Sequence, residues 1–127
     1  MTKMLCGYRV LDITQFVAGP TCSRLMAELG ADVIKVELTP IGDHARRSGL
    51  RSRKKEFANC TQSTYFAQHN HSKRSLAINL KSKEGQALIK KLIERSDVLV
   101  ENFAPGVIGR MGLAYDAVKK INPEIIM

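Results

Sequence analysis

The chain has 127 residues, of which 44% are hydrophobic and 25% are charged, a balance typical of one folded domain. Its net charge of +8 favours anionic partners, whereas an aromatic content of 6%, not interleaved with the basic residues, argues against single-stranded nucleic acid. No apolar run approaches the roughly 20 residues of a membrane span, and three widely spaced cysteines fit neither a disulfide framework nor a zinc knuckle, so we expect a cytoplasmic protein without nucleic-acid or membrane partners.

The first part of the chain alternates strand and helix signals. Residues 8–13 form a short β-branched stretch that predicts a strand, and Gly19-Pro20 then leads into a predicted helix over residues 21–29. Residues 31–37 predict a second strand. Four residues of the helix recur at i, i+3, i+4 and i+7, which predicts that they face a sheet. These residues are Cys22, Leu25, Met26 and Leu29.

Residues 38–64 interrupt this alternation, because they show no periodicity. The stretch is rich in basic side chains and poor in acidic ones. Its basic residues are Arg46, Arg47, Arg51, Arg53, Lys54 and Lys55. A structureless stretch of this length is usually functional or disordered, and its composition favours a mobile, solvated loop.

The same alternation returns in the second part of the chain. Residues 75–80 predict a strand, residues 82–95 a helix and residues 97–101 another strand. Ser82 suits the N-cap of this helix. The buried stripe of the helix is predicted to be Gly85, Leu88, Ile89, Leu92 and Ile93. A last helix runs through Leu113, Ala117, Val118 and Ile121 and stops at Asn122-Pro123, and residues 124–127 begin a further strand.

Strands that alternate with helices of this length imply βαβ units with right-handed crossovers. The sequence therefore predicts an α/β fold with a Rossmann-like parallel sheet and flanking helices. Ligands bind such sheets at the carboxyl ends of the strands. The segments to consider are residues 14–18, the chain after Leu38, Lys81, and the chain after Asn102.

Two of these segments suit a nucleotide. Free backbone N–H groups in the turn over residues 12–20 attract anions, although an ordinary strand-to-helix turn explains the sequence equally well. Asn102 can bond a base or ribose, Phe103 offers a stacking face, and Arg110 can reach a phosphate. A buried Phe and a surface Arg explain the same residues without a ligand.

Other chemistries find less support. Lys73 and Arg74 form a cationic entry into a strand, which suits phosphate contact but is more often a solvated charge cluster. The three histidines lack helical metal-ligand spacing with a carboxylate between them, so we expect no metal site.

The collected segments resemble the class III CoA-transferase family of the CaiB/BaiF type, which includes formyl-CoA transferases and α-methylacyl-CoA racemases. Each segment alone is a weak match, but their order and spacing together are specific. The matching segments are residues 7–12, 18–20, 29–37, 42–43, 70–75, 100–103, 105–106 and 110–112.

The resemblance implies that residues 1–127 are the N-terminal part of the large domain of an interlocked homodimer, with the remainder of the family fold absent. In the transferase branch, an Asp carboxylate attacks an acyl-CoA thioester, and coenzyme A passes through an aspartyl intermediate to a carboxylic acid. This Asp is expected beyond residue 127, so no residue of the chain is assigned a catalytic role. An acyl-CoA racemase and a catalytically inactive CoA-binding fragment are the alternatives.

The resemblance also implies half of a site for coenzyme A or acyl-CoA, bound as substrate with no tightly bound cofactor. The implied contacts are Val17 and Ala18 near the thioester, Ile78 and Lys81 at the adenosine, and Asn102, Phe103 and Arg110 at the adenosine diphosphate. Leu38 stands where a relative has an Arg that contacts the phosphate. Gln15, a candidate acyl-site contact, stands where the formyl-CoA type has His. Both departures argue against a formyl-CoA:oxalate enzyme and leave the acyl group open.

Overall fold

The computed structural model describes residues 2–48 and 63–127. Parallel strands form a four-stranded sheet in the order β3-β2-β1-β4. The strands are β1 (Arg9–Asp12), β2 (Asp32–Leu38), β3 (Arg74–Ile78) and β4 (Val98–Val100). The helices are α1 (Ala18–Glu28), the 3-10 helix η1 (His44–Arg47), α2 (Thr64–Asn70), α3 (Lys83–Ile93), α4 (Val107–Arg110) and α5 (Tyr115–Ile121). The predicted α/β fold with a parallel sheet is confirmed.

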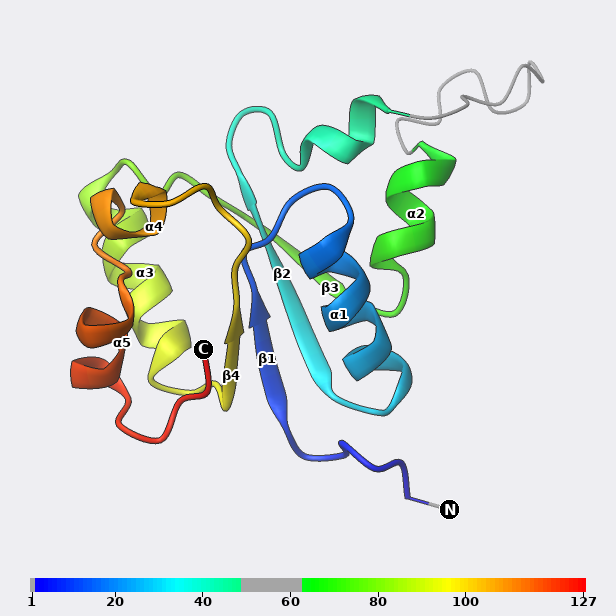
Figure 1. The fold of residues 1–127 in the computed structure, drawn as a ribbon, viewed down its shortest axis with the longest axis horizontal. Helices are drawn as coiled ribbons and strands as arrows, with labels where there is room; N and C mark the ends of the chain where they lie inside the picture. Colours follow the sequence, from blue (N-terminus) through cyan, green and yellow to red (C-terminus); the bar gives the residue numbers. More distant parts are fainter. Residues whose placement is uncertain (1, 49–62) are drawn as a thin grey trace.

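Helices cover both faces of this sheet. Figure 1 shows α1 and α2 on one face and α3, α4 and α5 on the other. The chain passes outward from β1 to β2 and β3, and then crosses to the far side of β1 to form β4. The direction of winding therefore reverses between β1 and β4, and the crevice outside the carboxyl ends at such a point is where open α/β sheets bind ligands.

The core lies on both faces of the strands, as expected for a parallel sheet. The larger cluster packs the sheet against α3 and α5 and includes Leu11, Ile34, Val36, Ile89 and Val118. The smaller one lies under α1 and consists of Val10, Ala27, Ala31 and Val33. Neighbouring residues of one strand therefore belong to opposite cores, because side chains alternate across a strand.

The predicted buried face of the first helix is wrong. Helix α1 begins at Ala18, not at residue 21, and its buried residues are Gly19, Pro20, Ser23 and Ala27. Cys22, Leu25 and Leu29 are exposed, and only Met26 of the predicted stripe packs partly on the core. The small residues decide the orientation, because α1 approaches the loop after β1 so closely that a Cβ on Gly19 would lie 2.3 Å from Thr14 Cγ2.

The third helix agrees better with its pattern. Ser82 caps α3 by accepting a hydrogen bond from the Gly85 N–H, as predicted. Gly85, Ile89 and Ile93 are buried, whereas Leu88 is exposed and lies at the edge of the predicted stripe.

The stretch over residues 38–64 contains some regular structure in the part that the structure describes. Residues 44–47 form η1, and α2 begins at Thr64. Residues 49–62, with Arg51, Arg53, Lys54 and Lys55, lie outside the described residues. At the end of the chain, residues 124–127 make one parallel backbone pairing, between Ile126 and Val98, where a strand was predicted. Among the described residues no helix is both long enough and apolar enough to cross a membrane.

Candidate functional site at the carboxyl edge of the sheet

Two loops meet beyond the carboxyl ends of β1 and β4. The Gln15 N–H donates to Asn102 Oδ1 at 2.9 Å, and Asn102 Nδ2 donates to the Gln15 carbonyl at 2.8 Å. One amide side chain thus joins the loop after β4 to the loop after β1. Asn102, which was predicted to contact the nucleotide, therefore also fixes the backbone of Gln15, and the sequence did not indicate this structural role.

The loop after β1 is fixed at every residue from Thr14 to Phe16. Asp12 Oδ1 accepts hydrogen bonds from the Thr14 N–H and hydroxyl, and the Thr14 carbonyl accepts one from Lys35 Nζ at 2.8 Å. The Phe16 N–H donates to Asp43 Oδ1 at 3.1 Å. Phe16 has a φ of 65°, a left-handed conformation that is uncommon outside glycine and requires surrounding contacts to hold it.

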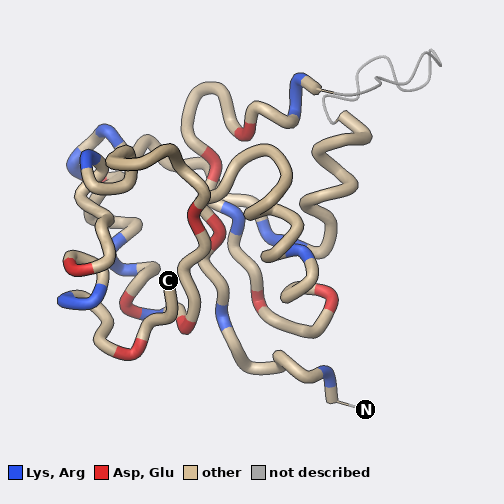
Figure 2. Tube along the Cα trace, viewed as in Figure 1, with Lys and Arg blue, Asp and Glu red and all other residues tan. Residues whose placement is uncertain are grey.

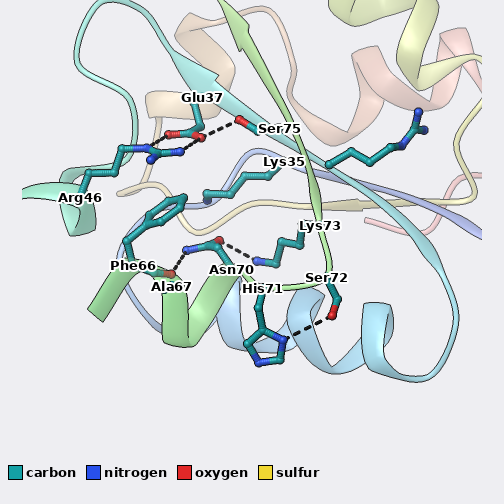
Figure 3. Close-up of a pocket in the computed structure, with 11 residues that line it drawn as sticks. Lys35, Glu37, Arg46, Phe66, Ala67, Asn70, His71, Ser72, Lys73 and Ser75 are labelled. Carbon is teal, nitrogen blue, oxygen red and sulfur yellow. Dashed lines mark hydrogen bonds and ion pairs between the residues drawn. The ribbon is translucent and has the colours of Figure 1, made fainter. Parts of the chain in front are cut away.

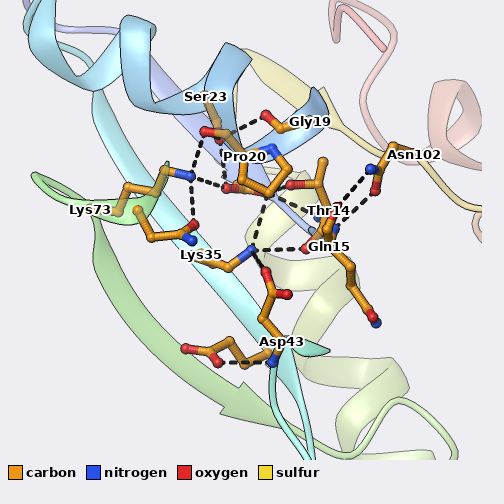
Figure 4. Close-up of polar contacts among 12 residues, drawn as sticks. Thr14, Gln15, Gly19, Pro20, Ser23, Lys35, Asp43, Lys73 and Asn102 are labelled. Atoms are coloured by element: carbon orange, nitrogen blue, oxygen red, sulfur yellow. Dashed lines mark hydrogen bonds and ion pairs between the residues drawn. The ribbon is translucent and has the colours of Figure 1, made fainter. Parts of the chain in front are cut away.

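These contacts come from a buried group of charged side chains, here called the ionic cluster, which consists of Asp12, Lys35, Asp43 and Lys73. Lys35 Nζ lies 2.9 Å from Asp43 Oδ2 and 4.0 Å from Asp12 Oδ1. Lys73 Nζ lies 2.9 Å from Asp12 Oδ2. All four side chains are at most 2% exposed. Figure 4 shows the cluster between α1, β2 and the loop after β1.

The surroundings of the cluster shift two of its pKa values. Burial raises the pKa of Asp12, but the ammonium groups of Lys35 and Lys73 outweigh it and, with hydroxyls from Ser23 and Thr14, hold the pKa below its usual range. Burial lowers the pKa of Lys73, although the Asp12 carboxylate opposes this shift. The cluster therefore holds its charges by pairing and does not present a free base or nucleophile.

A second ion pair, between Glu37 of β2 and Arg46 of η1, lies next to the cluster, because the Asp43 N–H donates to Glu37 Oε2. Arg46 donates to both carboxylate oxygens of Glu37 at 2.6 Å, and the Arg46 guanidinium lies 3.8 Å from the centre of the Phe66 ring (Figure 3). Burial raises the pKa of Glu37, but hydrogen bonds from Arg46, the Asp43 N–H and Ser75 lower it to about 2. A hollow of about 250 Å³ opens beside this pair, and the cationic side chains in its wall already bind carboxylates.

A different cavity lies at the carboxyl ends of β2 and β3, beside α4. This basic cavity has a volume of about 490 Å³. Its walls are formed by Leu38, Thr39, Asn79, Leu80, Lys81, Gln86, Val107, Arg110 and Met111. Neither Lys81 nor Arg110 forms an ion pair with any carboxylate of residues 2–48 and 63–127, and the walls contain no acidic side chain. Figure 2 colours basic residues blue along the chain at this end of α3 and α4.

The structure thus brings together two of the predicted nucleotide contacts, Lys81 and Arg110, in one cavity. Ile78 lies beneath it, buried in the core, and Phe103 packs partly against the same core. Val17 and Ala18 are exposed at the start of α1, where no side chain caps the helix.

Sequence reasoning assigned no role to the ionic cluster. Asp12 falls in the predicted strand over residues 8–13 and Asp43 in the stretch over residues 38–64, and Lys73 was interpreted as a phosphate contact or part of a solvated cluster. One signal was available, because Lys35 and Glu37 interrupt an otherwise apolar strand pattern, and charges inside such a strand need partners.

Comparison with known proteins agrees with this architecture. Residues 5–127 match the model of CoA-transferase family III. Formyl-CoA:oxalate CoA-transferases of Bradyrhizobium diazoefficiens and Rhodopseudomonas palustris (strain HaA2) are 44% and 46% identical to the chain over 127 residues, which are all of this chain and 28% of each relative. The chain therefore spans less than a third of the length of these relatives.

Solved structures match the fold as well. The crystal structure of a CAIB/BAIF family protein from Brucella suis has a TM-score of 0.84 at 33% identity, covering 99% of this chain and 32% of that one. A hypothetical protein from Mycobacterium tuberculosis has a TM-score of 0.84 at 36% identity, covering 98% of this chain and 32% of that one.

Proposed function

The chain belongs to CoA-transferase family III, and on this premise we propose that the protein containing it moves coenzyme A between an acyl-CoA and a carboxylic acid. The chain contributes part of the CoA-binding cleft, as the N-terminal part of the large domain. The acyl group is left open, because Leu38 and Gln15 depart from the formyl-CoA type at two positions of the site. The intact protein is a cytoplasmic homodimer in this proposal.

The observation that carries the proposal is the basic cavity, in which two cations form no ion pair with the part of the chain that the structure describes. Lys81 and Arg110 face a hollow without acidic walls at the edge where α/β sheets bind ligands. The phosphates in the adenosine diphosphate part of coenzyme A are the anionic partners that we assign to these two side chains. The full proposed set of contacts is Val17, Ala18, Ile78, Lys81, Asn102, Phe103 and Arg110.

The chemical step uses a residue outside this chain. An Asp carboxylate oxygen attacks the thioester carbonyl, the C–S bond breaks and the CoA thiolate departs. The product is a mixed anhydride between the acyl group and the Asp side chain. The thiolate then attacks the aspartyl carbonyl, which releases the acyl group as a carboxylate and forms an aspartyl-CoA thioester. The acceptor carboxylate attacks this thioester and displaces the CoA thiolate. The thiolate then attacks the acceptor carbonyl of the new anhydride, which forms the acceptor-CoA thioester and frees the Asp carboxylate. The residues of this chain bind the adenosine diphosphate part of coenzyme A while the acyl group is exchanged.

Trapping experiments on the intact gene product test the reaction. Hydroxylamine added during turnover is expected to leave a covalent adduct on an aspartate. Washout of α-deuterium from the acyl-CoA without an aspartyl adduct would contradict transfer and indicate a racemase of the same family.

Binding measurements test the part played by this chain. Labelled coenzyme A is expected to bind more tightly than ATP or a short single-stranded DNA at equal salt, because the cleft recognises more than phosphate charge. Equal affinities for the three probes would reject the CoA site. Sedimentation of the intact protein at twice the monomer mass is the expected result for the homodimer.

A further inference from the structure

A buried ion pair holds the loop after β1 from both sides of Gln15. Lys35 Nζ and Asp43 Oδ2 are 2.9 Å apart, and both side chains are at most 2% exposed. Lys35 donates to the carbonyl of Thr14, and Asp43 accepts from the N–H of Phe16. The pair thus binds the backbone immediately before and immediately after Gln15, while Asn102 holds both backbone polar groups of Gln15 itself.

Asp43 also orders the aromatic side chain next to Gln15. Its Oδ1 accepts a second hydrogen bond, from the Ala45 N–H at 2.9 Å, and so caps the start of η1. The cap places His44 in a stack with Phe16, with ring centroids 5.6 Å apart and an interplanar angle of 10°. One carboxylate therefore fixes the left-handed Phe16 backbone and the surface on which its ring rests.

This loop lies at the point where the winding of the sheet reverses, beside the carboxyl end of β4. Figure 4 shows the Gln15 side chain directed away from the ionic cluster. Phe16 is half exposed, at 50%. The ionic cluster therefore lies on the buried side of the loop, and the Gln15 side chain and Phe16 lie on the side that a ligand can reach.

We propose that Lys35 and Asp43 are positioning residues, which hold the loop over residues 14–16 so that Gln15 and the Phe16–His44 stack face the acyl end of the bound thioester. The inference rests on the proposed function, in which the basic cavity holds the other end of coenzyme A. Lys35 and Asp43 do not touch the substrate and act through the backbone of the loop.

Variants of the intact gene product separate this role from general stabilisation. Asp43→Ala removes both hydrogen bonds of Oδ1 and the partner of Lys35, and we expect kcat to fall about 10- to 100-fold while the affinity for free coenzyme A changes less than about twofold. Asp43→Asn keeps an oxygen acceptor and is expected to retain much more of kcat. Lys35→Met is expected to lower kcat in the same range. A parallel loss of kcat and CoA affinity would overturn the proposal.

The matched control is Asp32→Asn, which removes ion pairs with Arg9 and Arg74 at the opposite end of β2. It is expected to leave kcat unchanged within about twofold, since these partly exposed pairs contribute little. A loss of kcat as large as that of Asp43→Ala would show that any broken ion pair on β2 has this effect, and the proposal would fail.

Amide hydrogen exchange gives a readout that does not depend on activity. Asp43→Ala is expected to raise the exchange rate of the Phe16 amide about tenfold or more, with Ile89 in the core unchanged. If the intact protein shows no transfer but Phe16 exchange rises, the loop is held as described and the proposed function is wrong. If transfer occurs and Asp43→Ala changes neither kcat nor Phe16 exchange, the positioning role is wrong.

Discussion

The ionic cluster and the basic cavity both gather cationic side chains near the carboxyl edge of the sheet, yet they use them in opposite ways. Lys35 and Lys73 are buried and each lies 2.9 Å from a carboxylate. Lys81 and Arg110 line an open cavity and form no ion pair with residues that the structure describes. Among the cations that give the net charge of +8, Lys35 and Lys73 therefore stabilise the scaffold, whereas Lys81 and Arg110 are the ones that we propose bind a ligand.

The physical reason is the large free-energy penalty of a buried charge without a partner. Removing one member of a buried pair typically destabilises a protein by about 3–5 kcal/mol, whereas an exposed pair contributes about 0–1 kcal/mol. A substitution in the cluster should therefore affect folding, and a substitution in the cavity should affect binding.

The largest expected effect comes from Lys73→Met. It leaves the fully buried Asp12 carboxylate with Lys35 at 4.0 Å as its remaining cation, and we expect the free energy of unfolding to fall by about 3 kcal/mol. Urea denaturation measures this loss. Arg74→Met, at the next residue, removes an exposed side chain and is expected to change stability by less than about 1 kcal/mol. Similar losses of stability for both variants would contradict the difference between buried and exposed ion pairs.

The next largest effect is a pH dependence of the free energy of unfolding, which comes from the Glu37 carboxylate. Its folded-state pKa of about 2 lies below the ordinary value of 4.5, so its contribution to stability is complete above pH 4.5 and is lost as the pH falls toward 2. We expect this contribution to be roughly 2 kcal/mol, since Arg46 is partly solvated.

Comparison of the wild type with Glu37→Gln isolates this contribution from other acids that titrate in the same range. The stability difference between the two proteins is expected to be largest at neutral pH and to shrink between pH 4.5 and 2, as followed by urea denaturation at several pH values. A difference that does not depend on pH would mean that the Glu37–Arg46 pair is not the source.

A smaller effect is expected in the basic cavity. Lys81→Met and Arg110→Met should each weaken coenzyme A binding about five- to tenfold, because each removes one charge-assisted contact, with stability unchanged within about 0.5 kcal/mol. Isothermal titration of the intact protein measures the affinity. Lys83→Met, an exposed lysine at the start of α3 outside the cavity walls, is the control. Weakening by Lys83→Met alone would place the site elsewhere.

The smallest expected effect is a gain. Leu38 lines the basic cavity, and Leu38→Arg adds a third cation to walls in which the described residues include no acidic side chain. We expect coenzyme A to bind about two- to threefold more tightly, with the gain lost at high salt as screening increases. A gain that persists in high salt would argue against an electrostatic origin.

Local patterns predicted the elements well where the pattern and the packing agree. The Ser82 cap and the buried Gly85, Ile89 and Ile93 of α3 follow from spacing alone, because a long apolar stripe dominates the choice of face. The same rule failed in α1. There the close approach of Gly19 to Thr14 and the bond from Ser23 Oγ to Asp12 outweigh the larger apolar residues.

The α/β fold with its parallel sheet and the resemblance to the family can be inferred from the amino-acid order alone, because periodicity and the order of motifs are properties of the linear chain. Which charges are neutralised depends on contacts between distant residues. Lys73 and Asp12 are 61 residues apart, and Gln15 and Asn102 are 87 apart, so no local pattern pairs them. The folded sheet brings these groups to one edge, and burial there makes pairing necessary for some charges, whereas Lys81 and Arg110 form no ion pair within residues 2–48 and 63–127.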